Sequence, residues 1–172
     1  MAGSSTTRGG ARGRRTPKNP KSCHERALGL LAVRPRARRE LERRLLAAGF
    51  AADEVADVLT RLERVGLIDD EAFARQLADH QFGSRRAGRR AVSSALLAKG
   101  IAPELAARVA ADSPDDEQDR AVELARTRAG RLSGVDQHKA FGRLTSLLVR
   151  RGYAPDVARS AARMALEVDV QG

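Results

Sequence analysis

The sequence predicts an all-α protein that consists of three tandem three-helix repeats. Its apolar residues are mainly Ala and Leu, and only 3% of the chain is aromatic, a composition that suits close helix packing better than β-sheets. One helix-ending motif also occurs three times within the 172 residues, and such regular recurrence is typical of repeat architectures. We therefore expect an elongated, curved, solenoid-like body that follows a disordered basic N-terminal tail.

The recurring motif is an apolar helical segment that ends in a glycine, at Gly49, Gly100 and Gly152. These glycines are 51 and 52 residues apart, which sets the length of one unit. If Gly100 ends its helix as the C′ residue in the left-handed conformation, Ile101 should fold back onto Leu96 in a Schellman ending. The corresponding pairs in the other copies are Leu45 with Phe50 and Leu148 with Tyr153.

The first unit is predicted to span residues 22–67. We expect its first helix over residues 22–33 and its middle helix directly before Gly49. The third helix follows the corner, and its inward face is formed by Val55, Val58, Leu59 and Leu62, because residues three and four apart lie on the same side of a helix.

The second unit is predicted to span residues 68–112. Asp69 is expected as the N-cap of its first helix, with Ile68 and Phe73 in contact as a hydrophobic staple. Gly88 marks the entry of the middle helix. The third helix should start at Pro103, because proline is favoured at the first helical position.

The third unit is predicted to span residues 113–168, which leaves residues 169–172 as a C-terminal tail. Ser113 is expected as the N-cap of its first helix, with Asp116 three residues later in a capping-box arrangement. The third helix should start at Pro155 and direct Met164 inward.

The net charge of +10 is concentrated in residues 1–21, which carry six basic residues and no acid. This segment is rich in Gly, Ser and Thr and has no apolar face, so we expect it to be disordered. It is our candidate nucleic-acid-binding arm through Arg8, Arg12, Arg14, Arg15, Lys18 and Lys21. A mitochondrial transit peptide is also Arg-rich, but it requires an amphipathic helix that this segment cannot form.

The sequence predicts a cytoplasmic, monomeric protein that does not associate with membranes. No apolar run approaches membrane-spanning length, and no secretory signal is recognisable. The single cysteine, Cys23, excludes an internal disulfide framework and fits a reducing compartment.

Nothing in the sequence argues for an enzyme, a cofactor or a metal site. Asp69 and Asp70 are explained by helix capping, and the three histidines lack ligand spacing. Cys23 and His24 are neighbours in sequence, which rarely gives the geometry of a nucleophile and its base. Phosphate-binding loops and nucleophile elbows are absent from the sequence. We therefore assign no catalytic residue and no metal ligand.

Two clusters of basic residues are candidate binding sites. The stretch between Asp79 and Glu104 contains no acid, and its cations are Arg85, Arg86, Arg89, Arg90 and Lys99. Cations are unfavourable in the first turn of a helix, which suggests a function for Arg89 and Arg90 there, such as binding a phosphate or a partner's carboxylate. A solvated arginine-rich surface is the alternative. The second cluster, residues 34–44, is interleaved with Glu40 and Glu42, so helical ion pairs explain much of it.

The sequence resembles the RecX family of recombination regulators over roughly residues 22–168. The resemblance rests on Gly66–Ala74 (GLIDDEAFA), on Ser84–Ile101 (SRRAGRRAVSSALLAKGI) and on the tripled glycine corner, in this order and spacing. It implies tandem three-helix repeats without catalytic activity. It also implies binding to the RecA recombinase filament on single-stranded DNA and inhibition of its ATPase, strand-exchange and co-protease activities. The first corner has one extra residue before Val55, and the basic tail lies outside the shared pattern.

The two functional hypotheses differ in their partner. A regulator of the RecA filament would modulate homologous recombination and DNA repair, with at most a weak direct contact to DNA, and a modular binder suits a repeating filament because several modest contacts add up. The alternative is a nucleic-acid-binding protein of helix-turn-helix type that acts through its basic surface. DNA binding without recombinase and a steep salt dependence would favour the alternative.

Overall fold

The computed structural model describes residues 22–113 and 116–169, and within these residues it contains nine helices and no strand. The first unit consists of α1 (Cys23–Val33), α2 (Arg38–Ala47) and α3 (Ala52–Arg64). The second consists of α4 (Asp70–Gly83), α5 (Arg89–Ala98) and α6 (Pro103–Ala111). The third consists of α7 (Glu117–Ala129), α8 (Gln137–Arg150) and α9 (Pro155–Asp169).

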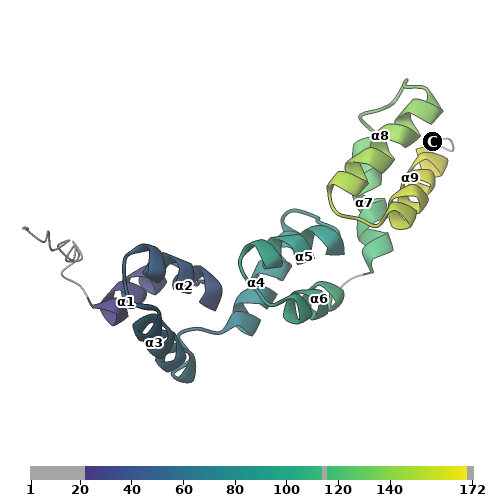
Figure 1. Cartoon of the computed structure of the whole chain (residues 1–172). Helices are drawn as coiled ribbons and strands as arrows, with labels where there is room; N and C mark the ends of the chain where they lie inside the picture. Colours follow the sequence, from purple (N-terminus) through teal and green to yellow (C-terminus); the bar gives the residue numbers. More distant parts are fainter. Residues whose placement is uncertain (1–21, 114–115, 170–172) are drawn as a thin grey trace, which may run out of the picture.

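The three units follow one another along an elongated, curved body (Figure 1). Helices pack mainly against other helices of the same unit. The corners at Gly100 and Gly152 each contact the start of the middle helix of the preceding unit. This arrangement confirms the predicted fold class for the described residues. The predicted tail at residues 1–21 lies outside them, as does the end of the chain from residue 170.

The three glycine corners are Schellman endings, as the sequence predicts. Gly49, Gly100 and Gly152 have φ of 96°, 88° and 88°, the left-handed region that disfavours a Cβ. In the second corner the Ile101 N–H donates to the Leu96 carbonyl at 3.2 Å, and the Gly100 N–H donates to the Leu97 carbonyl at 2.9 Å. The same two bonds recur in the other corners, and Ile101 and Tyr153 are buried.

The helix starts agree with the sequence in part. The Asp69 side chain accepts a hydrogen bond from the Ala72 N–H at 2.9 Å, so it is the predicted N-cap of α4. The expectation for Ser113 is wrong, because α7 is capped by Asp116, whose side chain accepts from the Gln118 N–H at 2.6 Å. Pro114, which that expectation placed at the first helical position, lies outside the described residues.

Each unit has its own hydrophobic core, with small exchanges at the boundaries. Ile68 packs with the first core and Phe73 against the second, so these two residues at the start of α4 contribute to different cores. Ala37 precedes α2 but is buried in the second core. Met164, expected on the inward face of α9, is 42% exposed. Among the described residues, no helix combines the length and apolar character that a membrane span requires.

Candidate partner-binding surface at the unit junctions

The first junction joins the corner of the second unit to the start of α2. A Cβ added to Gly100 would lie 2.8 Å from the Cβ of Arg39, so the two backbones approach too closely for a side chain. The backbone N–H of Arg38 donates to Asp70 Oδ1 at 2.8 Å, and the Arg38 guanidinium pairs with Glu63 at 2.8 Å. Asp70 thus satisfies one of the N–H groups that a helix start leaves open.

The Asp70 carboxyl is partly buried between the starts of α2 and α4. Burial raises the pKa of Asp70 above its ordinary value, the hydrogen bond from the Arg38 N–H lowers it in part, and nearby Glu63 raises it again. The bond between the two units is therefore made by a carboxyl that ionises less readily than an exposed one.

The second junction repeats this design with closer contact. A Cβ added to Gly152 would overlap Ala91, and a Cβ added to Gly88 would overlap the backbone of Gly152. The Gly88 N–H donates to the Arg151 carbonyl at 2.9 Å, and the Arg90 N–H donates to the Gly152 carbonyl at 3.1 Å. The second and third units are therefore hydrogen-bonded backbone to backbone.

An acidic residue again caps the middle helix of the preceding unit. The Arg89 N–H donates to Glu117 Oε1 at 2.8 Å, and the Arg89 guanidinium lies 3.9 Å from Glu117 Oε2. Glu117 is the first residue of α7, just as Asp70 is the first residue of α4. Both junctions thus use a carboxylate at the start of one unit to complete a helix of the unit before it.

The structure corrects our interpretation of the start of α5. We expected this helix start to bind a phosphate or a partner's carboxylate, which requires open N–H groups. Instead, those of Arg89 and Arg90 are occupied by Glu117 and by the Gly152 carbonyl. Glu117 also offsets the unfavourable position of cations at a helix start. The chain's own third unit therefore occupies this anion-binding position.

The four arginines at this junction have different roles. Arg86 pairs with Glu123 at 2.8 Å, and its carbonyl accepts a hydrogen bond from the Tyr153 hydroxyl at 2.9 Å. Arg86 also has a φ of 48°, the one positive value among the non-glycine residues that the structure describes. Arg85 and Arg90 are exposed, and neither has an ion-pair partner within the described part of the chain. Of these four arginines, Arg85 and Arg90 are therefore the two whose side-chain charge is not compensated by a described carboxylate.

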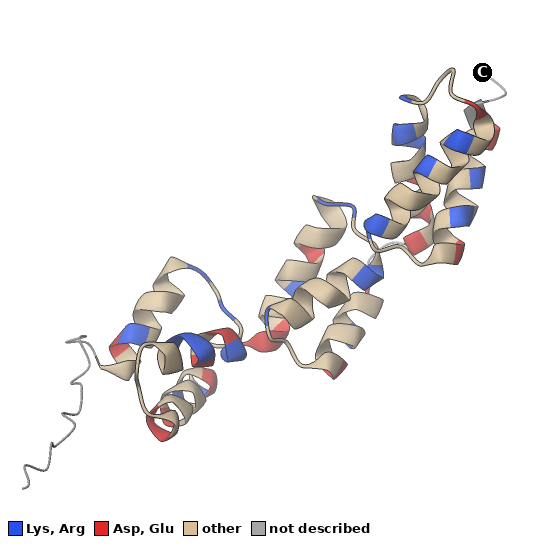
Figure 2. Cartoon of the chain, turned by 45° about the horizontal axis from the view of Figure 1, so that its top comes forward, with Lys and Arg blue, Asp and Glu red and all other residues tan. Residues whose placement is uncertain are grey.

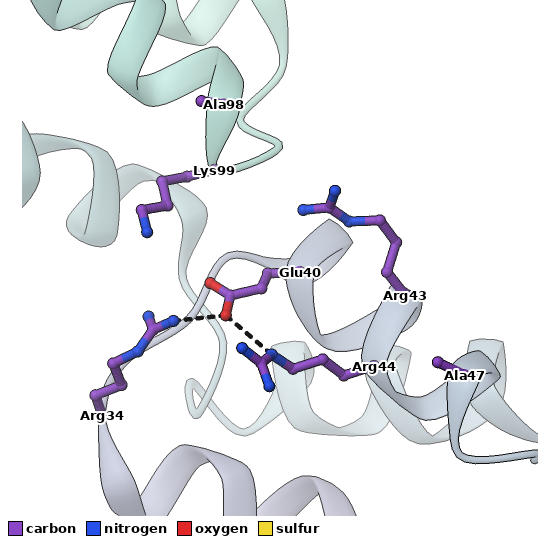
Figure 3. A pocket seen from close by; sticks show the side chains of 7 residues that line it. All are labelled: Arg34, Glu40, Arg43, Arg44, Ala47, Ala98 and Lys99. Atoms are coloured by element: carbon purple, nitrogen blue, oxygen red, sulfur yellow. Dashed lines mark hydrogen bonds and ion pairs between the residues drawn. The ribbon is translucent and has the colours of Figure 1, made fainter.

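Lys99 lies at the other end of α5 and does not join these arginines. It lines a cleft of about 410 Å³ between the first and second units (Figure 3). The cleft is lined by Arg34, Glu40, Arg43, Arg44, Ala47, Ala98 and Lys99. The structure therefore brings Lys99 together with the second basic cluster.

Glu40 is the acid at the base of this cleft, and it is only 7% exposed. Its Oε1 accepts hydrogen bonds from Arg36, Arg34 and Arg44 at 2.5, 2.6 and 3.1 Å, which confirms that ion pairs explain part of the cluster. Burial raises the pKa of Glu40, but the hydrogen bonds from Arg36, Arg34 and Arg44 outweigh it, so the pKa lies below its ordinary value.

The cleft nevertheless keeps a positive balance. Arg43 and Lys99 have no ion-pair partner among the residues that the structure describes, and one carboxylate stands against four lining cations. Figure 3 shows Lys99 approaching from the second unit and Arg43 from the first. Such a cleft attracts an anionic group of a partner.

Sequence reasoning missed the buried polar residues of the second junction. Arg120 is 8% exposed, and its guanidinium lies 4.7 Å from the centre of the Phe82 ring. Burial raises the pKa of the Tyr153 hydroxyl, which is hydrogen-bonded to the Arg86 carbonyl. One signal in the sequence could have indicated this contact, namely the hydroxyl of Tyr153. The matching corner residues, Phe50 and Ile101, have no polar side-chain atom.

The described residues offer little for catalysis or metal binding. No group of three or more His, Cys, Asp or Glu side chains in this part of the chain is placed to hold a metal ion. Cys23 is buried, and burial together with Glu54 raises the pKa of its thiol, which disfavours the nucleophilic thiolate. The candidate nucleic-acid residues of the tail lie outside the described residues.

Comparison with known proteins agrees with this architecture unit by unit. The chain matches the first, second and third three-helix domains of RecX over residues 23–62, 69–109 and 115–161. The Regulatory protein RecX of Mycolicibacterium smegmatis is 39% identical over 150 residues, which cover 82% of this chain and 80% of that protein. The Regulatory protein RecX of Streptomyces coelicolor is 34% identical over 154 residues, which cover 88% of this chain and 81% of that protein.

Solved structures show the same fold. The crystal structure of RecX from Lactobacillus salivarius superposes with a TM-score of 0.77 at 21% identity, covering 83% of this chain and 94% of that one. At this identity the likeness concerns the fold alone, whereas the three domains and the sequence relatives establish descent. The chain therefore belongs to the RecX family of regulatory proteins.

Proposed function

We propose that this protein binds the RecA recombinase filament on single-stranded DNA and inhibits its ATPase, strand-exchange and co-protease activities. It acts without catalysis of its own, as a cytoplasmic monomer, and so modulates homologous recombination, DNA repair and the SOS response. The observation that carries the proposal is the tandem match to all three RecX domains in order. The named relatives are regulatory proteins.

The geometry supports a binder of an extended partner. Three units in a curved row present several surfaces along one long body (Figure 1), and a filament offers equivalent subunits at successive positions. Modest contacts at several units then act together, because binding at one unit raises the effective concentration at the next. The positive cleft around Lys99 and the free cations Arg85 and Arg90 supply such contacts for acidic groups of the partner.

The decisive experiment is the DNA-dependent ATPase of the recombinase with this protein titrated in. We expect inhibition well below one molecule per recombinase monomer, because a binder that spans several subunits affects more than the one it contacts. Strand exchange and co-protease cleavage, measured in parallel, should fall over the same range. An ATPase rate that is unchanged at equimolar protein, with the fold intact by circular dichroism, would contradict the proposal.

The charge-reversal variant Arg43→Glu, Lys99→Glu tests whether the cleft binds the recombinase. These two cations have no ion pair among the described residues, so the reversal should weaken inhibition with little change in stability. The matched control is Arg126→Glu, Arg131→Glu, which removes the same charge from exposed positions of the third unit. Equal inhibition by both variants would remove the cleft from the binding surface.

A further inference from the structure

The exposed face of α8 carries cations that the chain does not neutralise. A surface hollow of about 550 Å³ is lined by Lys139, Gly142, Arg143, Ser146 and Arg150, all on this one helix. Lys139, Arg143 and Arg150 are exposed, and none of them has an ion-pair partner within residues 22–113 and 116–169. Gly142 and Ser146 leave the space between these long side chains open.

This face differs from the basic surfaces of the other two units. There several arginines are paired, for example three that meet Glu40 and two that meet Glu71, whereas the three cations of the α8 face have no such partner among the described residues. The α8 sequence contains no acid from Gln137 to Arg150. Lys139 occupies the first turn, where the helix dipole disfavours a cation, and Arg143 stands four residues further on, where like charges repel. Asp136 caps this helix start, and its side chain accepts a hydrogen bond from the Lys139 N–H at 3.1 Å. Arg143 and Arg150 lie further along the helix, where no described carboxylate pairs with them.

The spacing suits a linear anion. From Lys139 to Arg150 the helix rises about 16 Å, and duplex DNA carries one negative charge about every 1.7 Å along its axis. Figure 2 shows Lys and Arg segments following one another along α8. The lining residues include no aromatic side chain on which an unpaired base could stack, whereas sequence-tolerant single-strand binding depends on such stacking.

We propose that the α8 face, defined by Lys139, Arg143 and Arg150, binds the phosphate backbone of duplex DNA without reading its sequence. Small residues between the cations let the backbone approach the helix, and each cation neutralises one phosphate. This activity is separate from recombinase inhibition and requires no recombinase.

The test is a titration of a fluorescent 20-base-pair duplex with the full-length protein, without recombinase, at several salt concentrations. Three phosphate contacts contribute a slope of about −2.7 to the dependence of log affinity on log salt. Between 50 and 200 mM salt the unmodified protein should therefore lose about 40-fold more affinity than a Lys139→Gln, Arg143→Gln, Arg150→Gln variant.

Matched variants distinguish binding by the α8 face from a general effect of positive charge on DNA binding. Arg126→Gln, Arg131→Gln, Arg159→Gln removes the same charge from exposed positions of the same unit, and it should leave the salt slope nearly unchanged. Arg143→Lys, Arg150→Lys keeps the charges and should retain binding, and the helical circular dichroism of the glutamine variant should match that of the unmodified protein, which excludes misfolding as the cause of a loss. A second duplex of different sequence should bind equally well.

Three outcomes would overturn the proposal. The unmodified protein does not bind the duplex at low salt, or both glutamine variants lose the same affinity and slope, or the α8 variant loses recombinase inhibition while it retains DNA binding. In the last case the face is a protein-docking surface. Because the DNA assay contains no recombinase, its failure leaves the proposed regulation untouched, and the ATPase assay tests that regulation alone.

Discussion

At the residue scale, single glycines decide how the units approach one another. Gly100 has a positive φ, and a Cβ added to it would lie only 2.8 Å from the Arg39 Cβ. Two independent constraints therefore act on one residue, a local backbone conformation and a contact with another unit. Gly49 ends α2 with the same geometry but has no atom within 4 Å of an added Cβ, so only the first constraint acts there.

The first prediction follows from this contrast. Gly100→Val should lower the free energy of unfolding by more than the roughly 1–2 kcal/mol of a left-handed non-glycine residue, because the β-branched side chain also displaces Arg39. Gly49→Val should cost less, since it meets strain alone. Lys99→Ala should leave stability within about 0.5 kcal/mol and affect only partner binding. Urea unfolding followed by circular dichroism checks all three, and equal small effects of both valines would contradict our account of the corners.

The second prediction concerns Glu40 and the pH dependence of the free energy of unfolding. Its folded pKa lies below the ordinary value of 4.5, so its ion pairs stabilise the fold above that pH, and this stabilisation is lost as pH falls through the folded pKa. Glu40→Gln should cost about 2–3 kcal/mol at pH 7, because it leaves buried Arg36 without a counterion.

The difference in unfolding free energy between the Glu40→Gln variant and the unmodified protein should begin to shrink as the pH falls below about 4.5, and it should vanish below the folded pKa of Glu40, where both chains carry a neutral side chain. Glu42→Gln on the same helix is the control, and it should stay within about 0.5 kcal/mol at every pH. A difference for Glu40→Gln that does not depend on pH would mean that packing rather than charge explains the effect.

At the element scale, the start of α5 is a structural joint rather than an open anion site. Its N–H groups bind the third unit, and two of its four arginines pair with Glu117 and Glu123. The sequence correctly placed the helix entry at Gly88. It could not show that the carboxylate and the carbonyl that fill this entry come from residues 28 and 62 positions later, because no local pattern encodes that pairing.

The third prediction divides this cluster into two pairs. Arg86→Glu, Arg89→Glu places carboxylates beside Glu123 and Glu117, so it should lower the melting temperature by weakening the second junction. Arg85→Glu, Arg90→Glu changes the net charge by the same amount at exposed positions and should leave the melting temperature nearly unchanged while weakening recombinase inhibition. Full inhibition by the second variant, with its helical signal retained, would remove Arg85 and Arg90 from the partner-binding surface.

At the scale of the whole molecule, the units are small bodies with separate cores that are joined by few contacts. In such an array, stability is the sum of each unit and its interfaces with its neighbours. A weakened junction should therefore change the relative placement of two units while both keep their helices. Binding to an extended partner depends on that placement, because contacts at separate units must be made together.

The fourth prediction concerns the six positive charges of residues 1–21. Deleting this segment should leave the melting temperature nearly unchanged, because the described cores do not include it. Binding to bare DNA should weaken, and its salt slope should fall, since fewer phosphate counterions are released. If DNA affinity at low salt and the salt slope do not change, the tail is not a nucleic-acid arm. Combining the deletion with the glutamine variant of α8 distinguishes the contributions of the tail and of the α8 face to DNA binding.

The sequence by itself determined the features that depend on neighbouring residues. A glycine at C′, an apolar pair five residues apart around it and a proline at a helix start act over one or two turns. The corners and the unit repeat could therefore be derived from spacing alone. The expected N-cap of α7 was wrong because Ser113 and Asp116, three residues apart, are both good capping residues, and the local pattern does not rank them.

Only the tertiary structure decided which charges are free. Lys99 is separated in sequence from Arg43, yet both line one cleft, and Arg89 belongs to the same sequence motif as Lys99 but is used inside the second junction. Whether a cation is available to a partner depends on which carboxylate folding brings within about 4 Å of it. That distance is set by the packing of one unit on the next, and a linear sequence does not contain it.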